Sequence, residues 1–416
     1  MKQICVILLI FLSAGMNSYA QLTLEECLNL SRENYPLIKQ FDLIEKSREL
    51  NLSNAARLWL PQLSITGMAA LTEGIPDISL PGVAVENGNH RFVGRASLSQ
   101  TVWDGGYSKA LRRIANASAE VEAGNIEVEL HKVHERVNQI YFGILLINGQ
   151  LQQNLILSET LSSNVERAKT AARNGTAYQS DIDKIQVEIL NAEQSRINLQ
   201  AYRKAYIQML GNMTGREIDA ETTFLMPEPL NHLPAPEIHR PELQLFKRQQ
   251  KLNEAENFRL TASYMPKIGL TGFAIGITPG INIGVGKADH LLVAGLSMSW
   301  NISSLYTLNN DRNRIKINNR MIDARTETLL LNTRIEINSH NSEIERCRLL
   351  IQKDDEIVRL RERIKQSSET KYENGACTMA DLLNDINAEN LARQTKSQHE
   401  IEFLMFLYRQ KTSAGL

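Results

Sequence analysis

The stretch Leu58-Trp59-Leu60-Pro61-Gln62-Leu63 has a counterpart, SYMPKI, at residues 263–268, a shift of 205 residues. The tripeptides NYP at residues 34–36 and HRP at 239–241 are separated by the same shift, and NG at 174–175 recurs 200 residues later at 374–375. The features recur in the same order. The residue shift between corresponding features changes only slightly, as differences in loop length would produce. Two tandem repeats explain this better than chance does.

Proline placement leaves two long tracts free for helices. None of the eleven prolines falls within residues 82–226 or 280–416, and proline disrupts helix interiors. In the first tract apolar residues follow a heptad spacing of three and four, at Leu130, Val133, Val137, Ile140, Ile144, Ile147 and Leu151. We therefore predict a long helix over 104–173 with a return helix over 178–213. A second pair is predicted over 306–372, where Ile357, Leu360 and Ile364 keep a similar rhythm, and over 379–412.

Ahead of each long helix the hydrophobic period changes to two. Alternation after Pro61 and again over residues 92–102 predicts a β-hairpin at about 62–103, and the second repeat predicts another at about 267–302. The loops are expected at 74–88 and 278–289. Shorter helices are predicted at 22–31, opened by a Thr23–Glu26 capping box, and at 37–59. Taken alone, such strands favour an ordinary half-buried hairpin over a membrane barrel wall.

The predicted organisation has four parts. Residues 1–20 combine a basic start, an apolar stretch at 4–12 and a small-residue cleavage site, which is typical of a secretory signal peptide. The first repeat then covers 21–225, with its coiled coil at about 104–213. A proline-rich linker follows at 226–241, and the second repeat covers 242–416, with its coiled coil at about 306–412. No cysteine follows the expected cut, so an N-terminal lipid anchor is not indicated.

Composition and motifs exclude several classes of protein. Lys and Arg number 46 against 47 Asp and Glu, a net charge of -1 that lacks the basic surplus of a nucleic-acid binder. The longest strongly apolar run, residues 4–12, is far shorter than the roughly 20 residues of a membrane-spanning helix. His131 and His134 could share a metal, but no third ligand lies near them in sequence. No catalytic motif appears in a fitting context, so we predict neither an enzyme nor a cofactor or metal site.

The strand count points to an assembly. One chain supplies four candidate strands, whereas closed membrane barrels begin at about eight. Open strand edges in lipid would leave backbone groups unpaired. If the strands form a barrel, several chains must therefore pool them, and the sequence does not choose between two chains and three.

The chain resembles the TolC family of outer membrane efflux proteins. The features that carry the resemblance are LTLEE at 22–26 with NYP at 34–36, WLPQL at 59–63, VWDGG at 102–106 and the two Asn-Gly-x5-Asp turns. The resemblance implies a mainly α protein with β-structure: a homotrimer whose twelve-stranded outer-membrane barrel, four strands per chain, continues into a long periplasmic α-helical coiled-coil barrel. It also implies export with a periplasmic adaptor (membrane fusion protein) and an inner-membrane RND or ABC transporter.

The resemblance assigns roles to residues at the helical turns. Asn174, Gly175, Asn374 and Gly375 would form the tips that contact the adaptor. Asp181 and Tyr372 would hydrogen-bond to keep the periplasmic entrance closed, although Cys377 stands where the family usually has an arginine. Asp381 would contribute to a lumenal acidic ring, with Asn384 at the family's second acidic position. Alternatively, Asp381 is a helix N-cap or belongs to a solvated face.

Two functions remain open from the sequence. The first is a passive outer-membrane exit duct of a tripartite efflux or type I secretion system, gated like an iris. The second is an exported periplasmic coiled-coil adaptor or structural spacer. An adaptor would place one helical hairpin between β-rich halves, whereas this chain repeats hairpin and helices in tandem, which favours the duct.

Overall fold

The computed structural model describes residues 21–71, 79–80, 83–85, 90–175, 177–230, 235–282 and 287–416. The predicted signal peptide therefore lies outside the described residues. The chain divides into two compact units. Unit 1 holds residues 21–40, 126–243 and 327–416, and unit 2 holds 41–125 and 244–326. Each unit takes segments from both predicted repeats.

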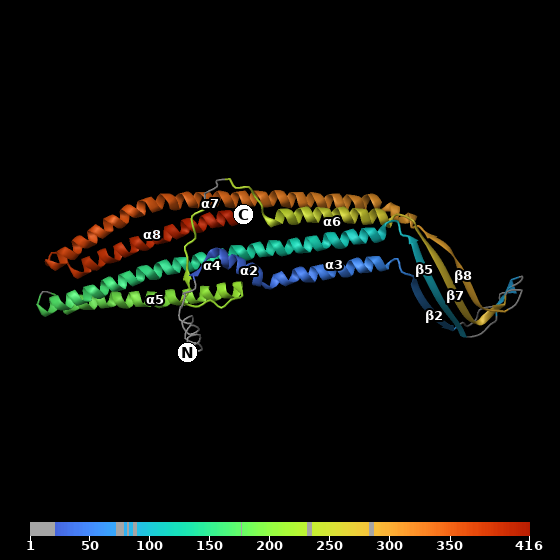
Figure 1. The fold of residues 1–416 in the computed structure, drawn as a ribbon, viewed down its shortest axis with the longest axis horizontal. Helices are drawn as coiled ribbons and strands as arrows, with labels where there is room; N and C mark the ends of the chain where they lie inside the picture. The colour runs from blue at the N-terminus through green and yellow to red at the C-terminus, as the bar shows by residue number, and fades with distance from the viewer. Residues whose placement is uncertain are drawn as a thin grey trace, which may run out of the picture. The chain divides into compact units, whose positions relative to one another are not determined.

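Four long antiparallel strands form the sheet of unit 2. They are β2 (Gln62–Leu71), β5 (His90–Trp103), β7 (Lys267–Asn282) and β8 (Lys287–Ser299), in the order β2-β5-β7-β8 (Figure 1). Both predicted hairpins, β2 with β5 and β7 with β8, are confirmed. The inner strands β5 and β7 join the two hairpins, so each repeat contributes half of one sheet.

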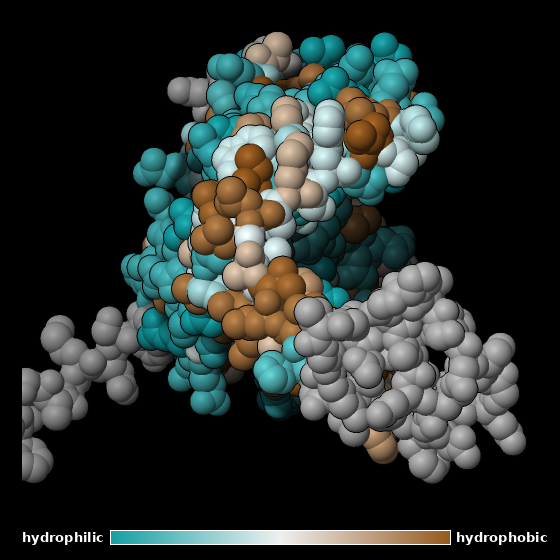
Figure 2. Space-filling model, turned by 90° about the vertical axis from the view of Figure 1, so that its right-hand side faces the viewer, coloured by the Kyte–Doolittle hydropathy of each residue, from teal (hydrophilic) through white to brown (hydrophobic). Residues whose placement is uncertain are grey.

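Side chains of the two sheet faces differ in character. Strand alternation and register place one set together, which we call the apolar face: Leu63, Ile65, Ala69, Phe92, Ala96, Leu98, Leu270, Ala274, Leu292, Ala294, Leu296 and Met298. The opposite face, which we call the mixed face, combines polar Ser64, Thr66, Arg95, Ser97, Ser99, Thr271 and Ser297 with apolar Met68, Val93, Phe273, Ile275, Leu291 and Val293. Leu296 is 81% exposed and Ile65 77%. Figure 2 looks onto the strand end and shows apolar side chains gathered on its surface.

The loops of the hairpins depart from the prediction. Within the expected 74–88 loop lie two short strands, β3 (Ser79–Leu80) and β4 (Val83–Val85), and β4 pairs with the far end of β7. The expected 278–289 loop is wrong, because β7 extends to Asn282 and β8 already begins at Lys287. The end of β7 pairs with β4 from the first loop and, beyond an irregularity in register, with the start of β8, and alternation within one strand reveals neither pairing.

Helices adjoin the strands within unit 2. They are α3 (Lys39–Arg57), most of α6 (Pro241–Ser263) and the first parts of α4 (Tyr107–Arg173) and α7 (Leu308–Glu373). Small side chains are buried between them, at Ala55, Ala110, Ala255 and Ala262. The α4 helix begins after Asp104, whose carboxylate accepts hydrogen bonds from the Gly106 N–H at 2.9 Å and the Ser108 N–H at 2.7 Å. A short 3-10 helix, η2 (Ile302–Tyr306), precedes α7.

Unit 1 is built on two helical hairpins. The long helices α4 and α7 each turn back into a return helix, α5 (Gln179–Thr214) and α8 (Met379–Ala414), as Figure 1 shows. Both return helices have 36 residues and end at a glycine with positive φ. The predicted helices are confirmed, and five seam residues of α4 are buried: Leu130, Val133, Val137, Ile140 and Ile144.

A small parallel sheet in unit 1 was not expected from the sequence. It pairs β1 (Gln21–Leu22) with β6 (Thr223–Phe224). The Tyr141 hydroxyl lies 2.8 Å from the carbonyl oxygens of both Leu22 and Leu225. The helix predicted from residue 22 therefore starts later, as α2 (Leu24–Asn34), where Thr23 and Glu26 form the expected capping box. A 3-10 helix, η1 (Pro36–Ile38), precedes α3.

Several apolar helix positions are largely exposed among the residues that the structure describes. The apolar residues noted on α7 from their spacing are Ile357, Leu360 and Ile364, and they are 45%, 43% and 43% exposed. On α5, Val187, Leu190 and Ile197 are each more than half exposed. Within the described part of the chain, no helix combines the length and apolar character that crossing a bilayer requires.

Candidate functional site at the helical turns

The two turns of unit 1 have the same backbone geometry. Gly175 and Gly375 adopt φ values of +75° and +68°, in the left-handed region that glycine enters without strain. Each closes its helix with an N–H bond of 3.0 Å, Gly175 to the Ala172 carbonyl and Gly375 to the Tyr372 carbonyl. The predicted tips are therefore confirmed as tight turns, while their contact with an adaptor stays a prediction.

An open cleft of about 1270 Å³ lies at the turns. It brings together most of the residues predicted for this end, with Asn174, Asp181, Tyr372, Asn374 and Gly375 all in its lining. Beneath it the two hairpins share an apolar cluster made of Leu161, Val165, Ala168, Ile182, Ile185, Met379, Leu382, Leu383 and Ile386. The side chains of the cleft thus stand on a packed base formed by α4, α5 and α8.

Asp181 serves its own helix at the first turn. Its carboxylate accepts the Tyr178 N–H at 3.3 Å and lies 3.2 Å from the Lys184 ammonium. The Asp181 N–H donates to the Tyr178 carbonyl at 3.0 Å. Tyr178 is the N-cap residue, yet its own side chain is 78% exposed and makes no cap hydrogen bond. Asp181 therefore supplies the polar cap that the tyrosine cannot.

The expected hydrogen bond between Asp181 and Tyr372 is absent within this chain. The Tyr372 hydroxyl is buried and has no hydrogen-bond partner among the residues described. Burial raises the pKa of Tyr372, and the nearby negative charge of Asp181 raises it further. The two residues line one cleft, but the Asp181 carboxylate is engaged at the start of α5. What Tyr372 contributes within the chain is packing against the apolar cluster.

The second turn has a complete capping box. Thr378 Oγ1 accepts the Asp381 N–H at 3.2 Å, and the Asp381 carboxylate accepts the Thr378 hydroxyl at 2.6 Å and the Thr378 N–H at 3.0 Å. These bonds hold the pKa of Asp381 below its usual value. The N-cap is thus Thr378, and Asp381 is the third residue of α8, where it completes the capping box instead of being the N-cap that the sequence offered as an alternative. Its exposed carboxylate leaves the lumenal role a prediction.

Cys377 makes a local contact where an arginine was expected. Its thiol donates to the Ser368 carbonyl at 3.4 Å, and the Ser368 hydroxyl donates to Asp385 at 2.5 Å. Like Cys27 and Cys347, it is a free cysteine. The end of α7 is therefore tied to α8 by a short polar chain that carries no cation.

Two polar contacts join the hairpins near the turns. Arg167 of α4 pairs with Glu373 of α7 at 3.5 Å, and Asn387 of α8 donates to Glu188 of α5 at 3.3 Å. The Arg167–Glu373 pair is solvent-exposed, so it contributes about 1 kcal/mol or less. The apolar cluster must supply most of the attachment between the hairpins.

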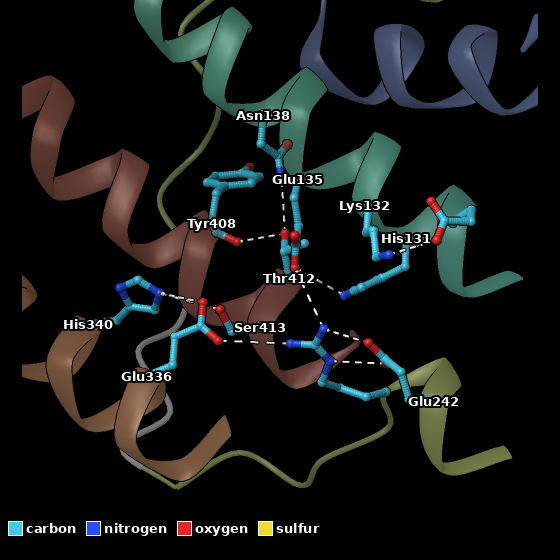
Figure 3. A network of polar contacts seen from close by, with 12 residues as sticks. His131, Lys132, Glu135, Asn138, Glu242, Glu336, His340, Tyr408, Thr412 and Ser413 are labelled. Carbon is cyan, nitrogen blue, oxygen red and sulfur yellow. Dashed lines mark hydrogen bonds and ion pairs between the residues drawn. The ribbon is translucent and has the colours of Figure 1, made fainter. Parts of the chain in front are cut away.

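A second polar cluster of unit 1 surrounds Arg240, at the end of the linker. Its guanidinium binds Glu242 at 2.7 Å and lies 3.9 Å from Glu135 and 3.8 Å from Glu336. Figure 3 shows the three glutamates converging from α4, α6 and α7. One cation thus holds the start of α6 against two long helices. The sequence analysis used residues 239–241 only as a repeat marker and missed this role.

Other omissions and exclusions concern single residues. The Thr378–Asp381 box was not recognised, because its Thr-x-x-Asp spacing carries an aspartate where the Thr-x-x-Glu pattern that identified Thr23 and Glu26 has a glutamate. The Nε2 atoms of His131 and His134 are buried without hydrogen-bond partners, and desolvation lowers the pKa of both. Over the described ranges, no three His, Cys, Asp or Glu side chains gather in a way that could hold a metal ion.

Comparison with known proteins identifies the fold. No protein-family model and no curated protein sequence matches the chain. Among solved structures, the outer-membrane channel OprN is 16% identical, with a TM-score of 0.70 covering 94% of this chain and 89% of that one. The outer membrane protein VceC from Vibrio cholerae is 11% identical, with a TM-score of 0.69 covering 94% and 96%. The Campylobacter jejuni CmeC outer membrane channel is 13% identical, with a TM-score of 0.67 covering 94% and 85%.

The likeness extends over almost the whole chain and almost the whole of each neighbour. The protein therefore has the fold of the TolC-type outer-membrane channels, mainly helical with one antiparallel sheet, as the sequence resemblance predicted. Identities of this size establish the fold alone. What the chain does has to be argued from its own surfaces.

Proposed function

We propose that the protein is the outer-membrane exit duct of a tripartite efflux or type I secretion system. In this proposal it forms a homotrimer whose barrel sits in the outer membrane and whose helices extend into the periplasm. It conducts substrates passively and catalyses no reaction. The observation that carries the proposal is the sheet of unit 2, which is apolar on one face and open at both edges.

The unpaired edges of the sheet support pairing with neighbouring copies of the chain. Within the described residues, β2 pairs only with β5, and β8 has only β7 as its partner. Unpaired backbone groups at such edges cost several kcal/mol each in hydrocarbon. Pairing β8 of one copy with β2 of the next satisfies both edges. Three chains with four long strands each then close a twelve-stranded barrel.

The apolar face supplies the surface that lipid requires. A protein dissolved in water seldom leaves a continuous apolar sheet face uncovered, yet Leu71, Leu292 and Leu296 are each 78% exposed or more. Strands of about ten residues match the thickness of a bilayer when they are tilted. A lipid environment accounts for these side chains, and a soluble spacer protein does not.

The uncovered helix positions support the same assembly. The exposed apolar residues of α5 and α7 lie on helices of unit 1, where a neighbouring copy would bury them. Energy for transport would come from an inner-membrane RND or ABC transporter, linked through a periplasmic adaptor that meets the tips at Asn174, Gly175, Asn374 and Gly375. No residue pattern in the chain assigns the substrate.

Conductance in a planar bilayer tests the duct. We expect the purified full-length protein to give small, long-lived current steps. Leu296→Arg should abolish insertion, because an arginine facing lipid at the midplane costs about 2–4 kcal/mol. Ser297→Arg is the matched control, since the adjacent residue lies on the mixed face and should be tolerated. A protein that gives no current and stays in the soluble periplasmic fraction would instead favour the adaptor or spacer function.

The gate is proposed to depend on the cleft at the turns. The Asp181 carboxylate caps α5 and the Tyr372 ring packs beneath the cleft, so both hold the turns in their present arrangement. We expect Asp181→Ala combined with Tyr372→Ala to increase the resting conductance and the uptake of bulky dyes by cells. Tyr372→Phe is the control, because it keeps the ring and removes only a hydroxyl without a partner. Unchanged leakage in the double variant would contradict this gate.

A further inference from the structure

Among the strand side chains that the structure describes, the mixed face carries one charged residue away from its strand ends. The structure describes the strand side chains of residues 62–71, 92–103, 267–276 and 290–299. Within these ranges the Lys, Arg, Asp and Glu residues are Arg95, in the middle of β5, and Lys267, which opens β7. The register partners of Arg95 are Thr66 on β2 and Ile275 on β7, and the hydroxyls of Ser64 and Ser97 lie 2.7 Å apart on the same face.

Arg95 is held by a ring and has no carboxylate partner. Its guanidinium carbon lies 4.7 Å from the centre of the Phe273 ring on β7, a cation–π contact. No ion pair joins it to any other residue that the structure describes. The strand side chains in the four ranges above include no Asp or Glu that could neutralise it. Among the described residues its positive charge is therefore uncompensated, and the contact with Phe273 holds it on the sheet.

Register decides which way this charge faces. Arg95 alternates with Gly94 and Ala96, which belong to the side of the sheet that the proposed function places against lipid. An arginine on that side would cost about 2–4 kcal/mol at the bilayer midplane. The mixed face must then line the barrel interior, and Arg95 with it.

We propose that Arg95 makes the barrel interior selective for anions, as a ring of three positive charges in the assembled channel. This inference rests on the proposed duct. Twelve strands about 4.8 Å apart and tilted by about 40° give a backbone radius of about 12 Å. The arginine side chains reach inward from it, so the axis lies within about one Debye length, 10 Å, at 0.1 M salt. Solutes with negative groups would be favoured at this level, and cations opposed.

Reversal potentials across a KCl gradient test the inference. At about 0.1 M salt, three screened charges at this radius should make the permeability ratio of K⁺ to Cl⁻ about threefold higher in Arg95→Gln than in the unchanged protein. The difference should vanish near 1 M salt, where the Debye length is about 3 Å. Arg95→Lys should keep the original ratio. Arg57→Gln, which removes an exposed cation from the end of α3, is the matched control and should leave the ratio unchanged.

Adding a charge gives an independent measurement. Ser97→Lys, two positions along the same face, should shift the ratio in the opposite direction, so the test does not depend on Arg95→Gln inserting normally. Channels with unchanged selectivity in Arg95→Gln and Ser97→Lys would overturn the inference while leaving the duct intact. An equal shift in Arg57→Gln would also overturn it. Absence of any current from the unchanged protein would overturn the proposed duct itself.

Discussion

The two turns of unit 1 share one backbone and differ in how they are capped. Gly175 and Gly375 have nearly the same left-handed conformation, and both return helices have 36 residues. At the second turn Thr378 and Asp381 satisfy each other's N–H groups, whereas at the first Tyr178 offers no side-chain acceptor. The two turns thus share the path of the chain more closely than they share the hydrogen bonds that stabilise it.

The largest effect should come from the apolar cluster on which both turns rest. Leu382 is 1% exposed and lies one helical turn after Thr378. Leu382→Ala should lower the free energy of unfolding by about 2–5 kcal/mol, because it leaves a cavity. Leu391→Ala, on the same helix but 61% exposed, is the control. Denaturant unfolding of the purified protein measures both, and equal losses would show that the cluster does not carry the hairpins.

The glycines test whether the two turns are equivalent. No atom lies within 4 Å of a Cβ added at Gly175 or Gly375, so an alanine meets only the strain of the left-handed conformation. Gly175→Ala and Gly375→Ala should each cost about 1–2 kcal/mol in thermal or denaturant unfolding. A much larger loss at one turn would mean that the shared backbone geometry hides a difference in contacts.

The two turns should differ in how much their capping residues contribute to stability. Thr378→Ala removes a side-chain acceptor and should cost about 1 kcal/mol, whereas Tyr178→Ala should cost little. Tyr178→Thr should stabilise the first turn by supplying the missing acceptor opposite Asp181. Melting temperatures of the three variants check this order. If Tyr178→Thr is destabilising, the exposed tyrosine ring has a role that outweighs capping.

The smallest effect is expected at Tyr372. Its hydroxyl is buried without a partner, so Tyr372→Phe should change the free energy of unfolding by less than about 0.5 kcal/mol, or stabilise slightly. The same denaturant titration measures it. A loss of 1–3 kcal/mol would indicate that the hydroxyl finds a hydrogen bond in the assembled protein.

Local patterns in the sequence predicted most of the fold. The proline-free tracts and the heptad spacing located α4 and α7 to within a few residues, and period-two alternation located the four long strands. Asn-Gly placed both turns, and the Thr23–Glu26 box placed the start of α2. Each of these features depends on residues close together in the chain, where spacing alone determines which side chains meet.

What the sequence did not predict depends on partners far apart in the chain. The pairing of β4 with β7 turned an expected loop into strand, and β1 with β6 joined residues some 200 positions apart. Three glutamates from different helices meet Arg240. At the candidate site, the resemblance paired Asp181 with Tyr372 in a hydrogen bond. In the chain the Tyr178 N–H and Lys184 engage the carboxylate instead, and local spacing did not predict that competition.

The pairing of β1 with β6 has a consequence for the order of folding. Gln21 and Leu22 cannot pair until Thr223 and Phe224 are available, and closing the loop between them carries an entropy cost that grows slowly with its length. If the chain is delivered N-terminus first, β1 cannot pair until β6, roughly halfway along the chain, has emerged. Late formation of the β1–β6 sheet would keep the N-terminal segment accessible to chaperones that bind unfolded chains. Completion of this small sheet would then mark the end of folding for the predicted first repeat.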